Sequence, residues 1–240
     1  MMIVLGIESC GDLGSVALSD EEKVLGEITI NVKKNHSITL APMVADLLKL
    51  ANLELKDIDA VAVDVGPGSF TGLRIGISLA SSLAYGADLP VVRVSGLDAL
   101  MSVGKQLLGN MSADKVVDDR LVSIIPMIFG RKNEVYVLSA GEYMVVDAVV
   151  FLNALSKDGK YLFIGDGYLA FRDLISEIGL DCVMVDESFH YVGGRNIASC
   201  GVADMKENKG ISPIAVEPLY LRRPEAEVNL EMKLKLNDNC

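Results

Sequence analysis

Apolar residues follow two different spacings along this chain, and the alternation between them predicts its secondary structure. Short runs such as Met2–Glu8 are apolar nearly throughout, as in buried strands, whereas Ser37–Leu53 carries apolar residues at helical spacing. In the first half we therefore expect strands at Met2–Glu8, Ser15–Ser19, Val24–Val32, Ala60–Val65 and Pro90–Val94. We expect a first helix at about Ser37–Leu53 and a third over Leu97–Leu108. A second helix should follow the strand Ala60–Val65 after a glycine-rich turn and run to about Tyr85.

The second half repeats this order of elements. We expect strands at Leu121–Phe129, Glu134–Ala140, Tyr143–Phe151, Lys160–Ile164 and Cys182–Val185, and helices at Leu152–Ser156, Tyr168–Ile178 and Arg195–Asn208. Three strands followed by alternating helices and strands are the ribonuclease-H-like order, a mixed sheet covered by helices. Because the segment 109–120 is polar, we expect an α/β protein of two tandem ribonuclease-H-like (actin-like) domains, residues 1–108 and 109–192. The C-terminal helix, within 193–226, is expected to fold back onto the first domain.

Composition and charge narrow the class of protein. A chain of 240 residues that is 50% hydrophobic can bury a sizeable core without disulfides or metals. The four cysteines are scattered, as reduced cytosolic thiols are, and no apolar run approaches the roughly 20 residues of a membrane span. The chain begins at once with a strand-like run, so we expect no signal peptide, a cytoplasmic protein and no membrane partner. A formal charge of −11 argues against free-standing nucleic-acid binding.

A glycine-rich turn between the fourth strand and the second helix is the most informative segment. It reads Gly-Pro-Gly-Ser-Phe-Thr-Gly-Leu-Arg-Ile-Gly over residues 66–76. The helix that follows carries a row of small residues at every fourth position: Gly72, Gly76, Ala80 and Ala84. Glycine inside a helix costs roughly 1 kcal/mol relative to alanine, so a packing or functional reason is expected. The row can receive either a partner helix or the chain's own sheet, and the residues alone favour neither.

Candidate chemistry gathers at the two turns of the first half. Exposed amides at a helix N-terminus can hold an anion, which makes Gly68 and Ser69 candidate phosphate contacts, although the turn lacks the lysine of a P-loop. In the first hairpin, Glu8, Ser9 and Asp12 are candidate nucleotide contacts, because a carboxylate there can hold Mg²⁺ with phosphates. For both sets, a structural role as turn residues is the favoured interpretation.

Other catalytic arrangements are not visible in the sequence. The two histidines, His36 and His190, are far apart and form no zinc pattern with the cysteines, so we expect no metal site. Ser69 is not in a Gly-x-Ser-x-Gly turn, and neither histidine can be assigned as its base. We therefore expect no catalytic residues and no cofactor.

The glycine turn resembles the hallmark of the TsaB (YeaZ) family, whose members help to make N6-threonylcarbamoyladenosine in tRNA. His36-Ser37 with Leu40 and Pro42, Arg131–Tyr136, Gly165–Gly167 and Pro218–Arg222 are also similar to segments of that family. The likeness covers most of residues 2–226. Departures include Glu8 where the family usually has Asp, Phe129-Gly130 before Arg131, Ile38 where Glu is common, and Asn133 in place of Gly. The tail after Ala226 is unassigned.

The resemblance implies a subunit that has no transferase activity of its own. It implies pairing with a TsaD-like catalytic subunit, joined by a TsaE-like ATPase, and contact with tRNA only through these partners. The histidine pair that holds the metal of TsaD is missing here, where His36 stands alone. The pairing surface implied is a bundle of the first two helices of each partner, which also forms homodimers when the chain is alone. We predict this surface to comprise His36, Leu40, Met43, Leu47, Leu50, Gly72, Ile75, Gly76, Leu79, Ala80 and Leu83.

Two other hypotheses remain open from the sequence. The duplicated order of elements, with Glu8, Asp12 and the glycine turns, is also compatible with an ATP-dependent enzyme of the actin-like or sugar-kinase class. A metallopeptidase would need a metal site that two separate histidines do not supply.

Overall fold

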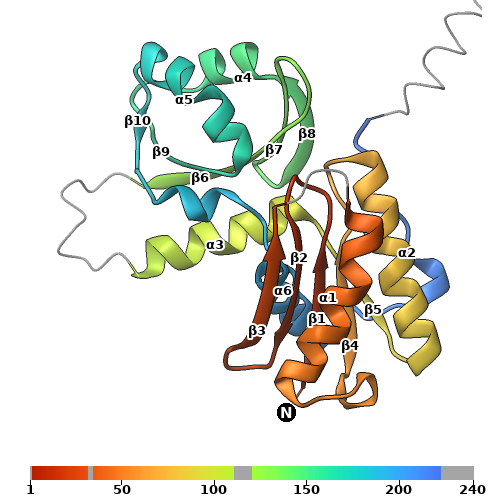
Figure 1. Cartoon of the computed structure of the whole chain (residues 1–240). Helices are drawn as coiled ribbons and strands as arrows, with labels where there is room; N and C mark the ends of the chain where they lie inside the picture. Colours follow the sequence, from red (N-terminus) through yellow and green to blue (C-terminus); the bar gives the residue numbers. More distant parts are fainter. Residues whose placement is uncertain (1, 32–34, 111–120, 223–240) are drawn as a thin grey trace, which may run out of the picture.

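Two five-stranded sheets, each with helices packed against it, make up the computed structural model of the chain (Figure 1). The structure describes residues 2–31, 35–110 and 121–222. The strands of the first sheet are β1 (Val4–Glu8), β2 (Gly14–Ser19), β3 (Val24–Ile30), β4 (Ala60–Asp64) and β5 (Val91–Val94). The second sheet contains β6 (Val122–Phe129), β7 (Glu134–Ser139), β8 (Glu142–Asp147), β9 (Lys160–Ile164) and β10 (Asp181–Cys182). The helices are α1 (His36–Ala51), α2 (Phe70–Ala87), α3 (Gly96–Asn110), α4 (Ala148–Ala154), α5 (Asp166–Ile178) and α6 (Gly194–Lys206).

The two sheets have the same topology. The strand order is β3-β2-β1-β4-β5 in the first and β8-β7-β6-β9-β10 in the second. In each, the first three strands form an antiparallel meander and the last two run parallel to the first strand. The predicted α/β class, with mixed sheets covered by helices in tandem, is confirmed. We call residues 2–110 together with α6 the N-terminal half, and residues 121–182 the C-terminal half.

Opposite faces of the first sheet are covered by different helices. Helices α1 and α2 pack on one face, and α6 packs across β1, β2 and β4 on the other (Figure 1). Successive side chains of a strand point to opposite faces of the sheet, so one strand can contribute to the cores on both faces. In β1, Leu5 and Ile7 lie in the core under α1 and α2, whereas Val4 lies in the core under α6. The last α-helix of the described chain therefore completes a sheet that begins at residue 4.

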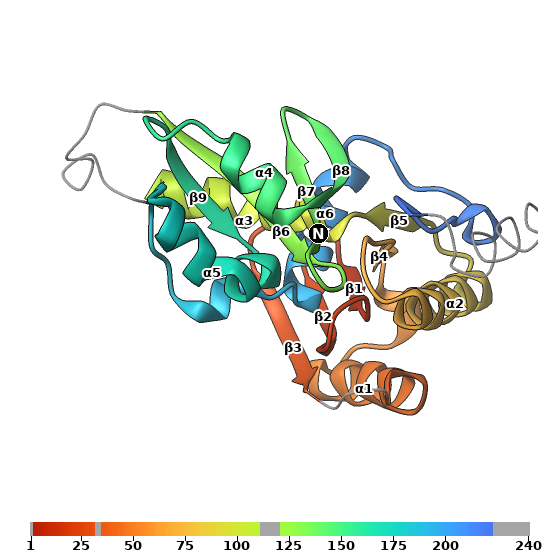
Figure 2. The same cartoon turned by 90° about the horizontal axis from the view of Figure 1, so that it is seen from above.

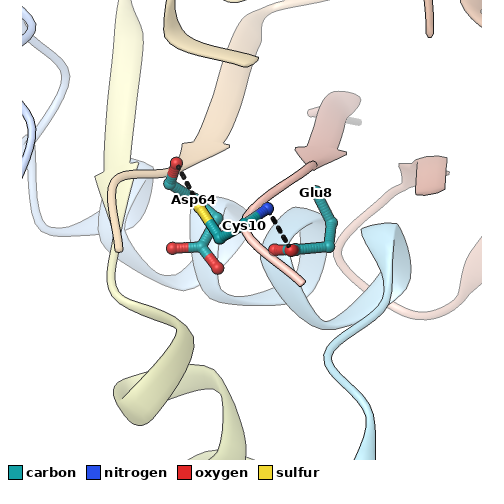
Figure 3. A group of neighbouring side chains, drawn as sticks. All are labelled: Glu8, Cys10 and Asp64. Carbon is teal, nitrogen blue, oxygen red and sulfur yellow. Dashed lines mark hydrogen bonds between the residues drawn. The ribbon is translucent and has the colours of Figure 1, made fainter. Parts of the chain in front are cut away.

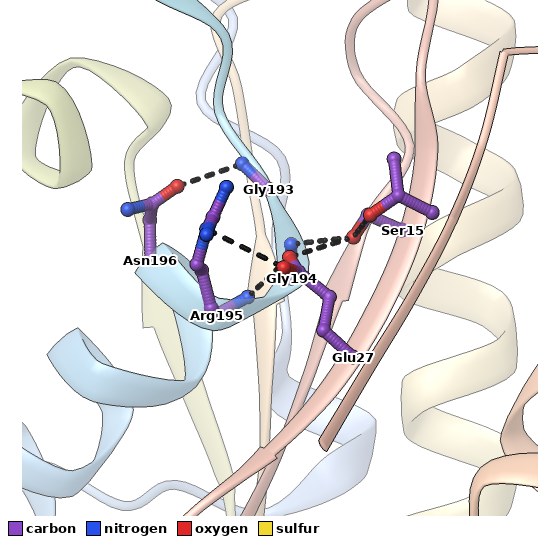
Figure 4. A network of polar contacts seen from close by, with 7 residues as sticks. Ser15, Glu27, Gly193, Gly194, Arg195 and Asn196 are labelled. Atoms are coloured by element: carbon purple, nitrogen blue, oxygen red, sulfur yellow. Dashed lines mark hydrogen bonds and ion pairs between the residues drawn. The ribbon is translucent and has the colours of Figure 1, made fainter. Parts of the chain in front are cut away.

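A polar network connects the start of α6 to strands β2 and β3 (Figure 4). Glu27 Oε1 accepts a hydrogen bond from the Arg195 backbone amide at 3.1 Å and from the Ser15 hydroxyl at 3.1 Å. The Gly194 amide donates to Ser15 Oγ at 2.8 Å, and Arg195 Nε forms an ion pair with Glu27 Oε2 at 3.3 Å. A carboxylate beside the first amides of a helix satisfies donors that the helix itself leaves unpaired.

Helix α3 connects the two halves. It contacts α6 in the N-terminal half and β6, β7 and β9 in the C-terminal half, as seen from above in Figure 2. The prediction for the segment after β7 was wrong in one respect. The expected strand Tyr143–Phe151 ends at Asp147, because the Asp147 side chain accepts from the Val150 amide at 3.1 Å and begins α4 there.

Candidate functional site

A cleft of about 810 Å³ lies between the two halves. Its N-terminal wall is formed by the turn after β1 and the glycine turn before α2. Its C-terminal wall is formed by the end of β6, the start of α5 and the segment that includes His190. The residues of the two walls that carry carboxylates are Glu8, Asp12, Asp64 and Asp166. Among the described residues that line this cleft, none is lysine or arginine.

Two buried carboxylates and a thiol form the floor of this cleft at the carboxyl ends of β1 and β4 (Figure 3). Because β1 and β4 are neighbouring parallel strands, Glu8 and Asp64 end at the same edge of the sheet. A carboxylate oxygen of each and Sγ of Cys10 all lie within 4.8 Å of one another. All three residues are buried.

Burial sets the protonation of this trio. It raises the pKa of Glu8 well above its usual range, and the nearby charge of Asp64 raises it further. Burial also raises the pKa of Asp64, against the lowering effect of its hydrogen bonds. Burial, then the charges of Asp64 and Glu8, raise the pKa of the Cys10 thiol. Two like charges are therefore unfavourable here unless a proton or a cation lies between them.

The C-terminal wall adds a further acidic group. Asp166 Oδ1 accepts from the Phe129 amide at 2.8 Å, and burial together with the charge of Asp12 raises the pKa of Asp166. His190 is buried with Nδ1 accepting from the Gly165 amide at 3.2 Å, and burial lowers its pKa. An acidic cleft of this kind attracts cations and repels polyphosphates.

The predicted nucleotide contacts lie in different surroundings. Glu8, Asp12, Gly68 and Ser69 line the cleft, with Gly68 close to the carbonyl of Cys10. Ser9 does not line it, because its hydroxyl donates to the Gly72 carbonyl at 2.8 Å beneath α2. Ser69 caps α2, its Oγ accepting from the Gly72 amide at 3.2 Å, and its own amide donates to the Cys10 carbonyl. The amides of Ser69 and Gly72 are thus already paired.

A groove of about 510 Å³ separates α1 from α2 on the outer surface of the N-terminal half. Four of the residues predicted for the pairing surface line it: His36, Leu40, Ile75 and Leu79. Leu50 is 79% exposed on α1, away from the lining residues of the groove. Met43 and Leu47 are buried in the core beneath α1, and Leu83 is half-buried against the same core.

The small-residue row of α2 contacts the chain's own first half, which corrects the expectation that it faces a partner. Gly72, Gly76 and Ala80 are buried. A side chain at Gly72 would meet the carbonyl of Ser9, and one at Gly76 would meet its hydroxyl. The small residues therefore allow α2 to pack closely against Ser9 in the turn after β1. Because this contact buries the row, it is not available to another protein.

Sequence reasoning missed several residues of both sites. Cys10 and Asp64 join Glu8 in the cleft floor; the signal that could have found Asp64 is its place at the end of a strand expected to run parallel to β1. On the two helices that form the groove, Ile38, Phe70 and Tyr85 are exposed apolar side chains. Tyr220, from the far end of the described chain, stacks on Phe70 with ring centroids 5.4 Å apart, a contact that no local pattern predicts.

Two halves of the same topology with a cleft between them define a two-domain protein of the ribonuclease-H-like, actin-like class. The family model described as TsaD, tRNA N6-adenosine threonylcarbamoyltransferase, matches residues 23–230. A curated relative, the tRNA threonylcarbamoyladenosine biosynthesis protein TsaB of Bacillus subtilis, is 30% identical over 94% of this chain and 96% of its own. Its counterpart in Escherichia coli is 29% identical over 92% of this chain and 95% of its own.

A solved structure supports the fold. The chain superposes on YeaZ from Pseudomonas aeruginosa with a TM-score of 0.71 and 24% sequence identity, over 92% of this chain and 100% of that one. The chain belongs to the TsaB family of tRNA threonylcarbamoyladenosine biosynthesis proteins, within the wider family that the TsaD model describes. The resemblance stated from the glycine turn is confirmed.

Proposed function

We propose that this chain is a non-catalytic subunit that pairs with a TsaD-like catalytic subunit through the groove between α1 and α2. The single observation that carries the proposal is the groove itself, about 510 Å³ in volume and lined by Leu40, Ile75 and Leu79. Phe70 also lines the groove, and Ile38, Leu50 and Tyr85 are exposed apolar side chains elsewhere on the same two helices. Apolar surface gathered in this way is typical of protein interfaces.

In this proposal the chain positions or activates its partner, and a TsaE-like ATPase joins the pair in the cytosol. The transfer of the threonylcarbamoyl group takes place in the partner, and tRNA is contacted through the partner. The strongly negative charge of the chain, −11, fits this division of labour. In the absence of the partner, the same surface forms a homodimer, because it then has a second copy of itself to cover it. Within the described residues, no helix combines the length and the apolar character needed to cross a membrane.

Size-exclusion chromatography of the chain mixed with a TsaD-like subunit tests the pairing. Leu79→Glu and Ile38→Glu are expected to weaken binding at least about tenfold, because an unpaired charge at an apolar contact costs more than the roughly 1.4 kcal/mol that this factor represents. Val150→Glu is the matched control, since Val150 is 70% exposed on α4 and Ile38 is 69% exposed on α1. Equal binding by all three variants would contradict the proposed surface.

An ATP-dependent enzyme remains the second candidate, because the cleft lies between the two halves. Its carboxylate lining opposes the binding of a polyphosphate that carries no metal ion. Calorimetry with Mg-ATP on the isolated chain separates the two candidates, and micromolar binding with turnover would favour the enzyme.

A further inference from the structure

The carboxylate of Glu8 has an unusual position for an acidic group. Glu8 is 2% exposed, and its Oε2 has no hydrogen-bond partner within the described part of the chain. A buried carboxylate oxygen without a donor is costly, because the water that it lost has not been replaced. A proton shared with Asp64, or a cation bound between the two carboxylates, would satisfy this atom.

The other oxygen of Glu8 shows that the side chain is held in place. Oε1 accepts from the amides of Cys10 at 2.7 Å and Gly11 at 3.0 Å. Asp64 is held in the same way, since its Oδ1 accepts from the amides of Gly66 at 2.7 Å and Gly96 at 3.1 Å. Each carboxylate is thus fixed by two backbone amides through one oxygen, and the two carboxylates face each other (Figure 3).

Two facing carboxylates are stabilised by a bridging proton or a bridging cation, and Cys10 adds a third donor atom that a cation could use. Its Sγ lies within 4.8 Å of an oxygen of each carboxylate, and the thiol donates to the Asp64 backbone carbonyl at 3.5 Å. A bridging proton needs no third group, whereas a metal ion gains a third donor from the sulfur. All three side chains line the cleft, which places the trio at the base of a space that an ion can enter.

We propose that Glu8, Asp64 and Cys10 bind a divalent transition-metal ion of the zinc type at the floor of the cleft. Two carboxylate oxygens and one thiolate suit such an ion better than Mg²⁺, which prefers six oxygen ligands and keeps much of its water. On binding, the thiol proton and any proton shared by the carboxylates pass to solvent, and the ion takes their place. The site needs neither a nucleotide nor the partner subunit, so it can fail without affecting the proposed pairing.

Cobalt(II) is the probe that tests this site, because it replaces zinc and gives a charge-transfer absorption band only when a thiolate binds it. The protein used carries serine at Cys182, Cys200 and Cys240, which leaves Cys10 as its one thiol. We expect one equivalent of cobalt to give the thiolate band and to raise the midpoint of thermal unfolding.

Substitutions of the three ligands then assign the site. Cys10→Ser is expected to abolish the band, and Glu8→Gln and Asp64→Asn to lower the affinity at least about 100-fold, since even residues that only support ligands cost 10–100-fold. Asp166→Asn removes a carboxylate from the same cleft without touching the trio and should leave binding unchanged. Circular dichroism identifies any variant that fails to fold, and Glu8→Gln retains an oxygen for the amides of Cys10 and Gly11.

Two results would overturn the proposal. A protein that shows no band and no thermal shift has a proton between its carboxylates. A band that survives in Glu8→Gln and Asp64→Asn belongs to cobalt bound by the thiol alone.

Discussion

At the scale of single residues, the clearest case is Gly76, whose role the sequence could not decide. A stripe of small residues has the same spacing whether it receives a partner helix or the chain's own backbone, so periodicity cannot separate the two. The structure separates them through Ser9, whose hydroxyl occupies the space that a side chain at Gly76 would need. The glycine is therefore a packing requirement of the first half.

Replacing Gly76 by Ala is expected to destabilise the fold by about 1–3 kcal/mol, the usual cost of overpacking. Gly86 is the matched control, because it lies in the same helix with open space around it. Gly86→Ala should instead stabilise by up to about 1 kcal/mol, the difference in helix propensity. Urea unfolding measures both, and equal effects at the two positions would contradict the packing role of Gly76.

His190 gives a prediction about pH at the same scale. Burial lowers its pKa below the ordinary value of 6.5, so near that pH the unfolded chain binds more protons than the folded one. The contribution of His190 to stability is therefore fully present above the unfolded pKa and is lost as the pH falls from there through the lower folded pKa. We expect the free energy of unfolding to fall more steeply between about pH 7.5 and about pH 5.5 in the natural chain than in His190→Gln, as measured by urea unfolding. Parallel curves would mean that His190 titrates alike in both states.

At the scale of elements, local pattern predicted most of the fold. Strand β9 was predicted with the bounds it has, and the predicted Ala60–Val65 differs from β4 by one residue. These strands are apolar runs between polar turns, which a linear pattern reports well. The C-terminal end of β8 was predicted too late, because the apolar residues Val149 to Phe151 suit a strand as well as a helix. Only the N-cap at Asp147 shows that they belong to α4. The prediction of the cleft floor was incomplete for another reason. Glu8 and Asp64 are brought together by the pairing of β1 with β4, and they are far apart along the chain.

The cap of α4 can be tested directly. Asp147→Ala removes the acceptor of the Val150 amide and is expected to cost about 1 kcal/mol of stability, the typical value for a lost N-cap. Asp147→Asn keeps an oxygen in the same place and should cost only a small part of that. Thermal unfolding of the two variants provides the comparison. If the alanine and asparagine variants are destabilised equally, the stabilising effect of Asp147 comes from its charge and not from capping.

At the scale of the whole molecule, the last described α-helix completes the first sheet. Helix α6 buries the face of that sheet formed by Val4, Ala60, Ala62 and Val92, and its own Ile197 and Val202 belong to the same core. The N-terminal half is therefore assembled from two segments separated by the whole of the C-terminal half. Contacts between such distant segments are invisible to sequence pattern, and here the return of α6 was expected only by analogy with the actin-like class.

The same geometry predicts which pieces of the chain fold alone. Residues 1–108 lack α6 and would expose the apolar side chains beneath it, so this fragment is expected to stay unfolded or to aggregate. Joining residues 1–108 to residues 193–222 through a flexible glycine-serine linker of about 20 residues, which spans roughly 25 Å on average, supplies the missing layer. This second fragment should unfold cooperatively in urea and show dispersed amide signals by NMR. Cooperative unfolding of residues 1–108 alone would contradict the argument, because the first sheet would then be stable with one face uncovered. The outcome also decides the domain division, since a fold that needs residues 193–222 cannot end at residue 108.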